Sequence, residues 1–382
     1  MRIPRFELDH WLASYEFASP PIRYNLASST GPAWTLGDLL ALGDGAGVKQ
    51  LGDLRLSYAP PQGSDALRRQ VAAFHDVDPD WVIITTGASE GLSALYCLAA
   101  EPGASITLPF PVFPAMPVMA RAWGLTVSTY TLDRTDGFRQ SAERVLAAVR
   151  ENTRLVLVNT PHNPAGSLMP QTEVARLAAN LEQRLIPLVV DEVYHPLYHG
   201  GSAPASAAQL PNTIVVGDLS KALSLPGLRI GWLIDRDARR RERLIDLRSY
   251  FTISGSPLTE AVAAHALANR ETILARLRAV AATNLAALRA FMSDHQDVLD
   301  WVAPTGGTTV FPWLRDGSDA RELCTRLANA GVLLAPGDCF DAPEHFRLGF
   351  GAQAEGFAQA LEIVSDALRE TRAVSVAAGG QR

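Results

Sequence analysis

Lys221 lies in the segment GDLSKALSLPGLRIGW, residues 217–232, just after a short apolar run. Its flanks, TIVV and LSLPGLRIGW, are apolar and contain no second lysine. A lysine in partly desolvated surroundings has a lowered pKa, and its neutral amine then acts as a nucleophile that forms Schiff bases with carbonyl compounds. Most lysines are solvated surface residues, so the apolar flanks are what favour the chemical interpretation here.

Asp191 ends the apolar run IPLVV, and Tyr194 follows three residues later. A carboxylate beside a pyridine nitrogen keeps that nitrogen protonated, so the ring can take up electrons. With Lys221, this favours a site for pyridoxal 5′-phosphate (PLP), and Tyr194 could donate to the ring hydroxyl. The alternatives are an aspartate that caps a helix and a buried tyrosine whose hydroxyl is satisfied by the protein.

A phosphate group would find partners in TTGASEGLSAL, residues 85–95, and at Arg229. Ser89 lies at a strand–glycine–helix junction, where free N–H groups and the helix dipole attract anions. Arg229 could add a two-pronged charge-assisted contact. Phe113, in LPFPVFPAM, could stack on a planar ring. The alternatives are an ordinary serine cap, an ion-paired arginine and a core phenylalanine.

The elements that must position these residues are short apolar strands separated by helical patterns. The expected strands are residues 81–86, 105–110, 126–132, 154–160, 186–192, 213–219 and 229–235. Such alternation predicts a mostly parallel sheet with helices on both faces. Strand ends of a parallel sheet share one edge, so Ser89, Asn163, Asp191, Tyr194 and Lys221 are expected to converge there.

Three segments divide the chain. Residues 1–36 have no evident sheet partner and are expected to pack with a small domain or a dimer partner. Residues 37–255 are expected to form a large α/β domain. Residues 256–382 begin with a long helical pattern followed by short strand-like pieces, which predicts a smaller α+β domain.

The composition narrows the class of protein. The 382 residues are 47% hydrophobic and 19% charged, which suits a globular protein with a substantial core. A net charge of -6 and a pI near 5.8 argue against a nucleic-acid partner. There is no signal-peptide or membrane-span pattern, and the three cysteines, Cys97, Cys324 and Cys339, suggest neither disulfides nor a metal site. We expect a cytoplasmic protein without metal or membrane partner.

Together these motifs resemble those of the class I/II aminotransferases, which are fold-type I PLP enzymes. SKALSLPGLRIGW resembles their cofactor-lysine signature, NTPHNPAG their Asn-Pro-x-x-Gly turn, and VVDEVY their Asp-x-x-Tyr motif. YAPPQGSDALRRQV is similar to their N-terminal Tyr…Gly…Leu-Arg block. The resemblance spans about residues 24 to 370. It implies a mostly parallel seven-stranded sheet in a large PLP-binding domain plus a smaller α+β domain.

The resemblance also implies roles for the cofactor-binding residues. Lys221 would hold PLP through an imine bond, Asp191 would pair with the pyridinium, and Asn163 and Tyr194 would bond the ring hydroxyl. Phe113 would stack on the ring. The expected phosphate partners are Ala88, Ser89, Ser220, Arg229 and, from the neighbouring subunit, Tyr58.

For the substrate, Arg347 in HFRLGFG matches the family arginine that binds the α-carboxylate, and Gly31 and Asn163 are further expected contacts. One departure is Asp218, which stands where many relatives carry Ser or Thr. A carboxylate there would repel a phosphate, so we expect it to turn away or to pair with Arg229.

The expected activity is PLP-dependent transamination between an L-amino acid and a 2-keto acid, in a homodimer. Other PLP reactions stay open, since a β-lyase, decarboxylase, oxidase or cyclase needs the same lysine and aspartate. The segments LDHWLASYEF and NLASSTGPAWTLGDLLAL are similar to those of capreomycidine synthase, an aminotransferase relative that cyclises a hydroxylated arginine.

Two alternatives lie outside PLP catalysis. GASEG, residues 87–91, fits the Gly-x-Ser-x-Gly elbow of serine hydrolases, for which His345 could be the base. No His-Gly oxyanion motif precedes it, and the Lys221 segment would stay unexplained. A PLP-binding sensor without catalysis is the other alternative, which the negative net charge disfavours.

Overall fold

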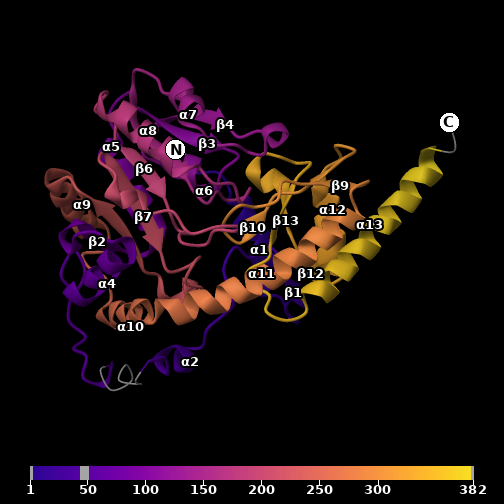
Figure 1. Cartoon of the computed structure of the whole chain (residues 1–382), viewed down its shortest axis with the longest axis horizontal. Coiled ribbons are helices and arrows are strands. Elements are labelled where there is room, and N and C mark those ends of the chain that lie inside the picture. Colours follow the sequence, from indigo (N-terminus) through magenta and orange to yellow (C-terminus); the bar gives the residue numbers. More distant parts are fainter. Residues whose placement is uncertain (1–2, 44–50, 380–382) are drawn as a thin grey trace.

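A seven-stranded sheet lies at the centre of the larger part of the protein (Figure 1). The structure is a computed structural model, which describes residues 3–43 and 51–379. The strand order is β2-β8-β7-β6-β5-β3-β4, and β8 alone runs antiparallel to its neighbours. The strands are β2 (Val82–Thr85), β3 (Ser105–Phe110), β4 (Thr126–Thr131), β5 (Thr153–Asn159), β6 (Leu188–Asp191), β7 (Thr213–Asp218) and β8 (Gly231–Asp235). They coincide with the seven predicted runs, so the predicted mostly parallel sheet is confirmed.

Helices cover both faces of this sheet because the central strands are apolar on both sides. In β5, Leu155 and Leu157 pack with one hydrophobic cluster and Val156 and Val158 with another. The first face carries α5 (Gly87–Ala99), α6 (Ala115–Ala122) and α9 (Ala238–Phe251), and the second carries α4 (Asp65–His75), α7 (Ala142–Ala148) and α8 (Gln171–Glu182). Short 3₁₀ turns are η1 (Pro79–Trp81), η2 (Arg134–Asp136), η3 (Ala207–Gln209), η4 (Pro226–Leu228) and η5 (Gly337–Phe340).

The C-terminal part follows α10 (Pro257–Ala268) and the long α11 (Arg270–Asp294), which runs from beneath the large sheet toward the smaller ones (Figure 1). The strands there are β9 (Leu299–Asp300), β10 (Thr309–Val310), β11 (Trp313–Leu314), β12 (Val332–Leu333), β13 (Ala335–Pro336) and β14 (Phe346–Gly349). They pack with α12 (Ala320–Asn329) and α13 (Phe357–Gly379). The long helices followed by short strands agree with the helical pattern and the strand-like pieces expected for this part of the chain. The domain boundaries at residues 36 and 255 stay predictions.

The N-terminal segment lies against these C-terminal elements. It contains α1 (Glu7–Glu16), β1 (Tyr24–Asn25) and α2 (Leu36–Leu40). Strand β1 pairs in parallel with β12, a pairing that the sequence did not reveal because each strand has only two residues. The Trp11 indole also donates to the carbonyl oxygen of Leu334 at 2.7 Å. Residues 26–31 are thereby carried across the end of the large sheet.

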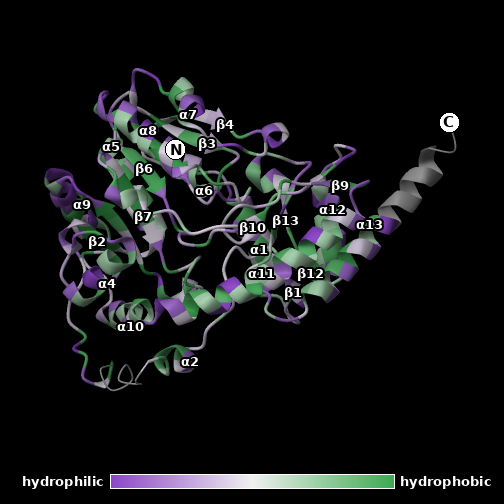
Figure 2. Cartoon of the chain, viewed as in Figure 1, coloured by the Kyte–Doolittle hydropathy of each residue, from purple (hydrophilic) through white to green (hydrophobic). Residues whose placement is uncertain are grey.

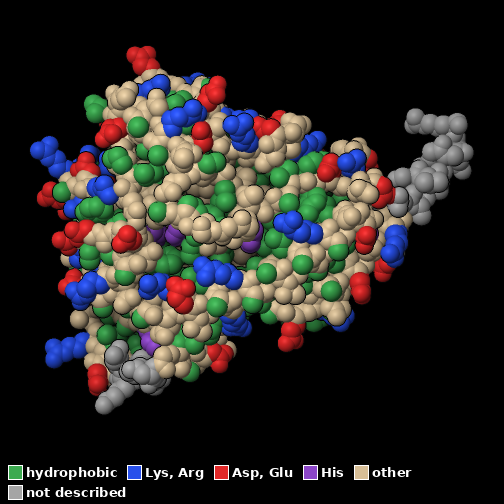
Figure 3. Space-filling model, in the orientation of Figure 1, with side chains coloured by type: hydrophobic (Ala, Val, Ile, Leu, Met, Phe, Trp, Pro, Cys, Tyr) green, Lys and Arg blue, Asp and Glu red, His purple; other side chains and the backbone are tan. Residues whose placement is uncertain are grey.

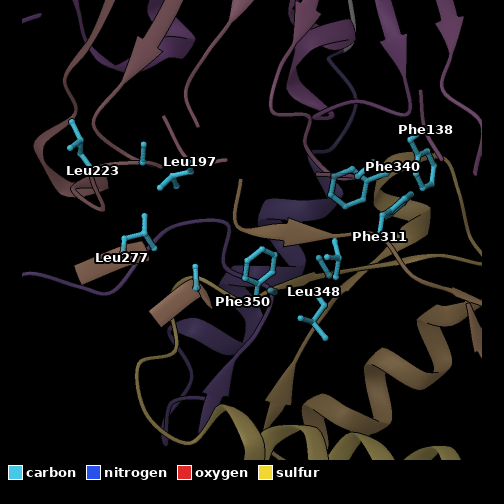
Figure 4. Close-up of a cluster of buried hydrophobic side chains, with 14 of the residues drawn as sticks. Phe138, Leu197, Leu223, Leu277, Phe311, Phe340, Leu348 and Phe350 are labelled. Atoms are coloured by element: carbon cyan, nitrogen blue, oxygen red, sulfur yellow. The ribbon is translucent and has the colours of Figure 1, made fainter. Parts of the chain in front are cut away.

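A hydrophobic cluster joins the two parts of the chain. Figure 4 shows Leu197 and Leu223, from loops after β6 and β7, near Leu277 of α11. In the same view Phe311 lies beside Phe340, with ring centroids 5.6 Å apart, and Phe350 lies near Leu348. The hydropathy colouring agrees, with apolar residues along the strands and polar residues on the outer turns of the helices (Figure 2). No helix among residues 3–43 and 51–379 has an apolar stretch long enough to span a membrane.

Replacing Leu157 by Ala tests the sheet core. Leu157 is fully buried in β5, so its truncation should lower the free energy of unfolding by about 2–5 kcal/mol. Leu185→Ala is the control, because Leu185 is 91% exposed and its truncation should change stability by about 0.5 kcal/mol or less. Urea unfolding followed by circular dichroism measures both, and equal effects would contradict this packing.

Candidate active site

Lys221 lies in the turn that follows β7, and its amine reaches the N-terminal segment. Its Nζ donates a hydrogen bond to the Ser29 hydroxyl at 2.8 Å, across 192 residues of sequence. Burial lowers the pKa of Lys221, and the nearby guanidinium groups of Arg347 and Arg229 act in the same direction. The carboxylates of Asp218 and Asp191 oppose that shift. The site therefore favours a neutral amine compared with a lysine in water.

Tyr194 meets the same segment. Its hydroxyl donates to the carbonyl oxygen of Ser29 at 3.2 Å, and the hydroxyl of Thr308 donates to that oxygen at 3.1 Å. Burial raises the pKa of Tyr194, so the phenol stays protonated and can donate. The loop is shaped locally by Asn25, whose side-chain oxygen accepts the N–H groups of Ala27 and Ser28, both at 3.1 Å.

Asp191 ends β6 with its carboxyl buried. Burial raises the pKa of Asp191 to about 7, although the N–H of Val193, at 3.1 Å from Oδ1, acts in the opposite direction. Asp218 raises this pKa further, and Lys221 lowers it. A second cation beside Asp191 would stabilise the carboxylate, since opposite charges favour the ionised form. Asp191 is therefore suited to hold a protonated nitrogen.

Asn163 and Arg347 form the opposite side of the site. The side-chain oxygen of Asn159 accepts the N–H of Asn163 at 2.7 Å, which fixes the turn after β5. Arg347 in β14 donates from Nη1 to the side-chain oxygen of Asn163 at 3.2 Å and from Nη2 to the carbonyl of Ala27 at 2.8 Å. Its Nε is buried and has no partner among the described residues. Arg347 thus keeps one donor for a bound anion.

The first turn of α5 lies beside Arg229. A Cβ on Gly87 would lie 2.7 Å from Arg229 Nη2, so the glycine leaves the space that the guanidinium fills. Gly87 also has φ +74°, which favours glycine. Ala88 is half-buried, Ser89 is exposed and Ser220 is buried. Free N–H groups, a positive helix end and a guanidinium together suit a phosphate.

Asp218 does not pair with Arg229, which was one of the two arrangements expected of it. Its Oδ1 accepts the N–H of Ser220 at 2.9 Å, whereas Arg229 donates from Nη1 to the carbonyl of Pro226 at 3.2 Å. No ion pair joins the two side chains in the described part of the chain. Arg229 acts on Asp218 only through its field, which slightly opposes the effect of burial on that pKa.

The remaining predicted residues are not joined to this network by hydrogen bonds in residues 3–43 and 51–379. The Phe113 ring is half-buried and packs edge-on against the Phe6 ring, with the two ring centroids 5.8 Å apart. Gly31 is closely packed, because a Cβ there would clash with Ser224 Oγ and lie 2.7 Å from Leu277 Cδ1. Tyr58 is 79% exposed.

The hydrolase alternative finds no geometry to support it. The His345 ring stacks on the Phe311 ring, with centroids 4.4 Å apart, and its Nδ1 lies 3.0 Å from the carbonyl oxygen of Phe311. Its Nε2 lies 3.3 Å from Arg134 Nη1. In the described residues no hydrogen bond links His345 to Ser89.

Ser29 is the site residue that sequence reasoning missed. It is only 8% exposed and contacts both Lys221 and Tyr194. The run LASSTGP that contains it matches no catalytic motif and lies outside any regular element. The signals that could have found it were the group of small hydroxyl residues and the predicted substrate contact at Gly31, two residues further on.

Residues 45–364 match the family described as aminotransferase class I and II. The chain belongs to this family. Capreomycidine synthase of Streptomyces vinaceus is 31% identical over 373 residues, which are 96% of this chain and 94% of that protein. A PLP-dependent aminotransferase from Streptococcus suis superposes with a TM-score of 0.88 at 28% identity and covers 97% of this chain and 99% of its own. The PLP-dependent cyclase OrfR superposes with a TM-score of 0.85 at 27% identity, and the match covers 97% of this chain and 98% of the cyclase chain.

This member of the class I and II aminotransferase family is an enzyme, and its cofactor is PLP. The residues present fit that group. A buried amine and a buried carboxyl act on each other electrostatically at Lys221 and Asp191. Gly87 lets the Arg229 guanidinium approach the start of α5, where it could bind the cofactor phosphate. Arg347 has a buried Nε without a partner among the described residues, which could bind a substrate carboxylate.

Lys221→Ala tests the covalent anchor. Borohydride reduction of the wild-type holoenzyme should attach the cofactor to the peptide that contains Lys221, and mass spectrometry should find no attachment in the variant. Lys49→Ala is the control, since Lys49 is the other lysine of the sequence and lies outside the described residues. Attachment that survives in Lys221→Ala would contradict this site.

Ser29→Ala should lower the pKa of Lys221 in the cofactor-free protein. The Ser29 oxygen accepts a hydrogen bond from the amine, which stabilises the ammonium form by about 1.5–3 kcal/mol, or about 1–2 pH units. The pH profile of the rate at which pyridoxal reacts with Lys221 should therefore move to lower pH. Ser29→Thr keeps the hydroxyl and should keep the profile, and an unchanged midpoint in Ser29→Ala would show that the contact is immaterial.

Proposed function

We propose that this enzyme transfers the amino group of an L-amino acid to a 2-keto acid. The observation that carries this proposal is that Lys221 and Arg347 share one buried site, spanned by residues 27–29 of the N-terminal segment. An α-amino acid has an amine and a carboxylate on one carbon. The carboxylate matches the buried guanidinium of Arg347, and the amine matches the cofactor carbonyl that Lys221 would hold.

Arg347 would bind the substrate carboxylate. Its Nη1 and Nη2 are already held by Asn163 and Ala27, so the guanidinium is oriented before substrate arrives. Its buried Nε has no partner among the described residues and is a donor for a carboxylate oxygen. A charge-assisted contact from a preoriented group loses little conformational entropy on binding.

Lys221, Asp191, Asn163 and Tyr194 would hold the cofactor ring, and Phe113 would stack against it. PLP, when bound, supplies an electron sink that stabilises negative charge at the α-carbon of the substrate. Asp191 would keep the ring nitrogen protonated, and Tyr194, as a neutral phenol, would donate a hydrogen bond. Ala88, Ser89, Ser220 and Arg229 would bind the phosphate at the start of α5.

Lys221 would then move the proton. Because burial lowers its pKa, more of the Lys221 amine is neutral, and only the neutral amine can accept a proton from the α-carbon. The ammonium group so formed could then give that proton to a second position. General acid–base catalysis of this kind contributes about 10²–10⁴-fold to the rate. Ser29 would orient Nζ between those positions.

Cyclisation of an amino-acid side chain is a second candidate. Capreomycidine synthase aligns over 96% of this chain, and a PLP-dependent cyclase superposes over 97% of it. The same lysine, aspartate and arginine would serve either reaction. The two candidates differ in what leaves the site, which is a keto acid in transamination and a cyclic amino acid in cyclisation.

We further propose a homodimer that acts in cytoplasmic amino-acid metabolism. Tyr58 is 79% exposed and would reach the phosphate of the partner subunit. Tyr250, near the end of α9, and Ile253, just after it, are exposed, and they support a subunit contact surface at this end of the helix. The face drawn in Figure 3 intersperses acidic and basic side chains, which does not favour a nucleic-acid partner.

A single-turnover panel tests the proposed reaction. The holoenzyme is incubated with individual L-amino acids, including a hydroxylated arginine, without any keto acid. Transamination should release keto acid equal to the amount of enzyme and then stop, until a keto acid such as 2-oxoglutarate restarts it. Lys221→Ala should release none. A product that keeps its amino group and has lost water, formed in many turnovers without a keto acid, would favour cyclisation instead.

A further inference from the structure

Asp218 borders the place where α5 begins. It is the last residue of β7 and lies directly opposite Gly231 of the antiparallel β8. Side chains of directly opposed residues point to the same face of a sheet. A Cβ on Gly231 would lie 2.5 Å from the carbonyl carbon of Gly87 and 2.6 Å from the nitrogen of Ala88. Asp218 therefore points to the face on which the first turn of α5 rests.

The groups around Asp218 do not neutralise it by direct contact. Lys221 and Arg229 act on it through their fields. Asp218 in turn raises the pKa of Asp191 in β6. Strand β8 contributes Gly231 and β2 contributes Thr85, whose hydroxyl donates to the carbonyl of Gly87 at 2.8 Å. Glu90, also in the first turn of α5, accepts the hydroxyl of Thr252 at 2.6 Å. Among the described residues, the direct donors to Asp218 both belong to Ser220: its N–H, at 2.9 Å from Oδ1, and its hydroxyl.

We propose that Asp218 couples cofactor binding to a proton, so that its carboxyl is ionised in the free protein and takes up one proton from solvent when the cofactor phosphate binds. This rests on the phosphate site proposed above. An ionised carboxyl beside a phosphate would meet like charge in surroundings of low dielectric constant, where repulsion is strong. The neutral carboxyl avoids that repulsion and can act as a donor.

The direction of the pH effect follows from the two states. Burial raises the pKa of Asp218 in the free protein, with Lys221 and Ser220 opposing the shift. A bound phosphate raises that pKa again, since like charge favours the neutral form. Between the two pKa values, the dissociation constant for the cofactor should rise about tenfold for each pH unit, because binding consumes a proton. Below both values, and above both, this contribution should be constant.

Calorimetry of the cofactor-free protein tests this coupling. PLP is titrated into wild type and Asp218→Asn in two buffers of different ionisation enthalpy, from about pH 5.5 to about pH 9, the range that buried carboxyl groups reach. Wild type should take up as much as one proton more than the variant. The ratio of the wild-type to the variant dissociation constant should grow about tenfold per pH unit within that window. Asp218→Ser provides a second uncharged variant if Asp218→Asn folds poorly.

Two controls locate the effect. Asp366→Asn changes a carboxylate that is 70% exposed and should behave as wild type does. Pyridoxal, which lacks the phosphate, should show no difference between wild type and the Asp218 variants. Equal proton uptake and parallel pH profiles with PLP would overturn the proposal, as would a difference of the same size with pyridoxal. No amino acid is present, so neither result depends on whether the enzyme transaminates.

Discussion

The hydrogen bond between the Lys221 amine and the Ser29 hydroxyl is the contact on which the site depends. Burying an amine costs free energy unless it is hydrogen-bonded, and the Ser29 hydroxyl accepts a hydrogen bond from it at 2.8 Å. The same residue accepts the Tyr194 hydroxyl through its carbonyl oxygen, and Ala27 accepts Arg347. The loop is therefore held by the same side chains that we propose to bind the cofactor and the substrate.

That loop reaches the site because the N-terminal segment is anchored to the C-terminal part of the chain. Strand β1 pairs with β12, and Trp11 bonds the backbone at Leu334. The cluster around Leu277 and Phe350 then fixes these elements against the loops that follow β6 and β7 (Figure 4). Three separate stretches of sequence must fold together before Lys221 has its partner.

Charge balance is the second organising feature. Asp191 and Asp218 project from neighbouring strand ends, and Lys221, Arg229 and Arg347 surround them. Among the described residues none of these five groups forms an ion pair with another, so each perturbs the pKa of the others through the low-dielectric interior. Perturbed titratable groups of this kind gather where a charged ligand completes the set. A PLP molecule would bring both a cation, for Asp191, and an anion, for Arg229.

The sequence by itself determined the sheet, the strand ends and the residues at them. Seven apolar runs of the right length became the seven strands, since burial on both faces requires continuous apolar sequence. Asn163, Asp191 and Lys221 were found because each follows such a run within a recognisable motif. What only the tertiary structure decided was Ser29, the Gly87–Arg229 approach and the absence of an ion pair between Asp218 and Arg229 in the described residues. Those contacts join residues from separate elements, and no local pattern of hydrophobicity or spacing encodes which side chains will meet across such distances in sequence.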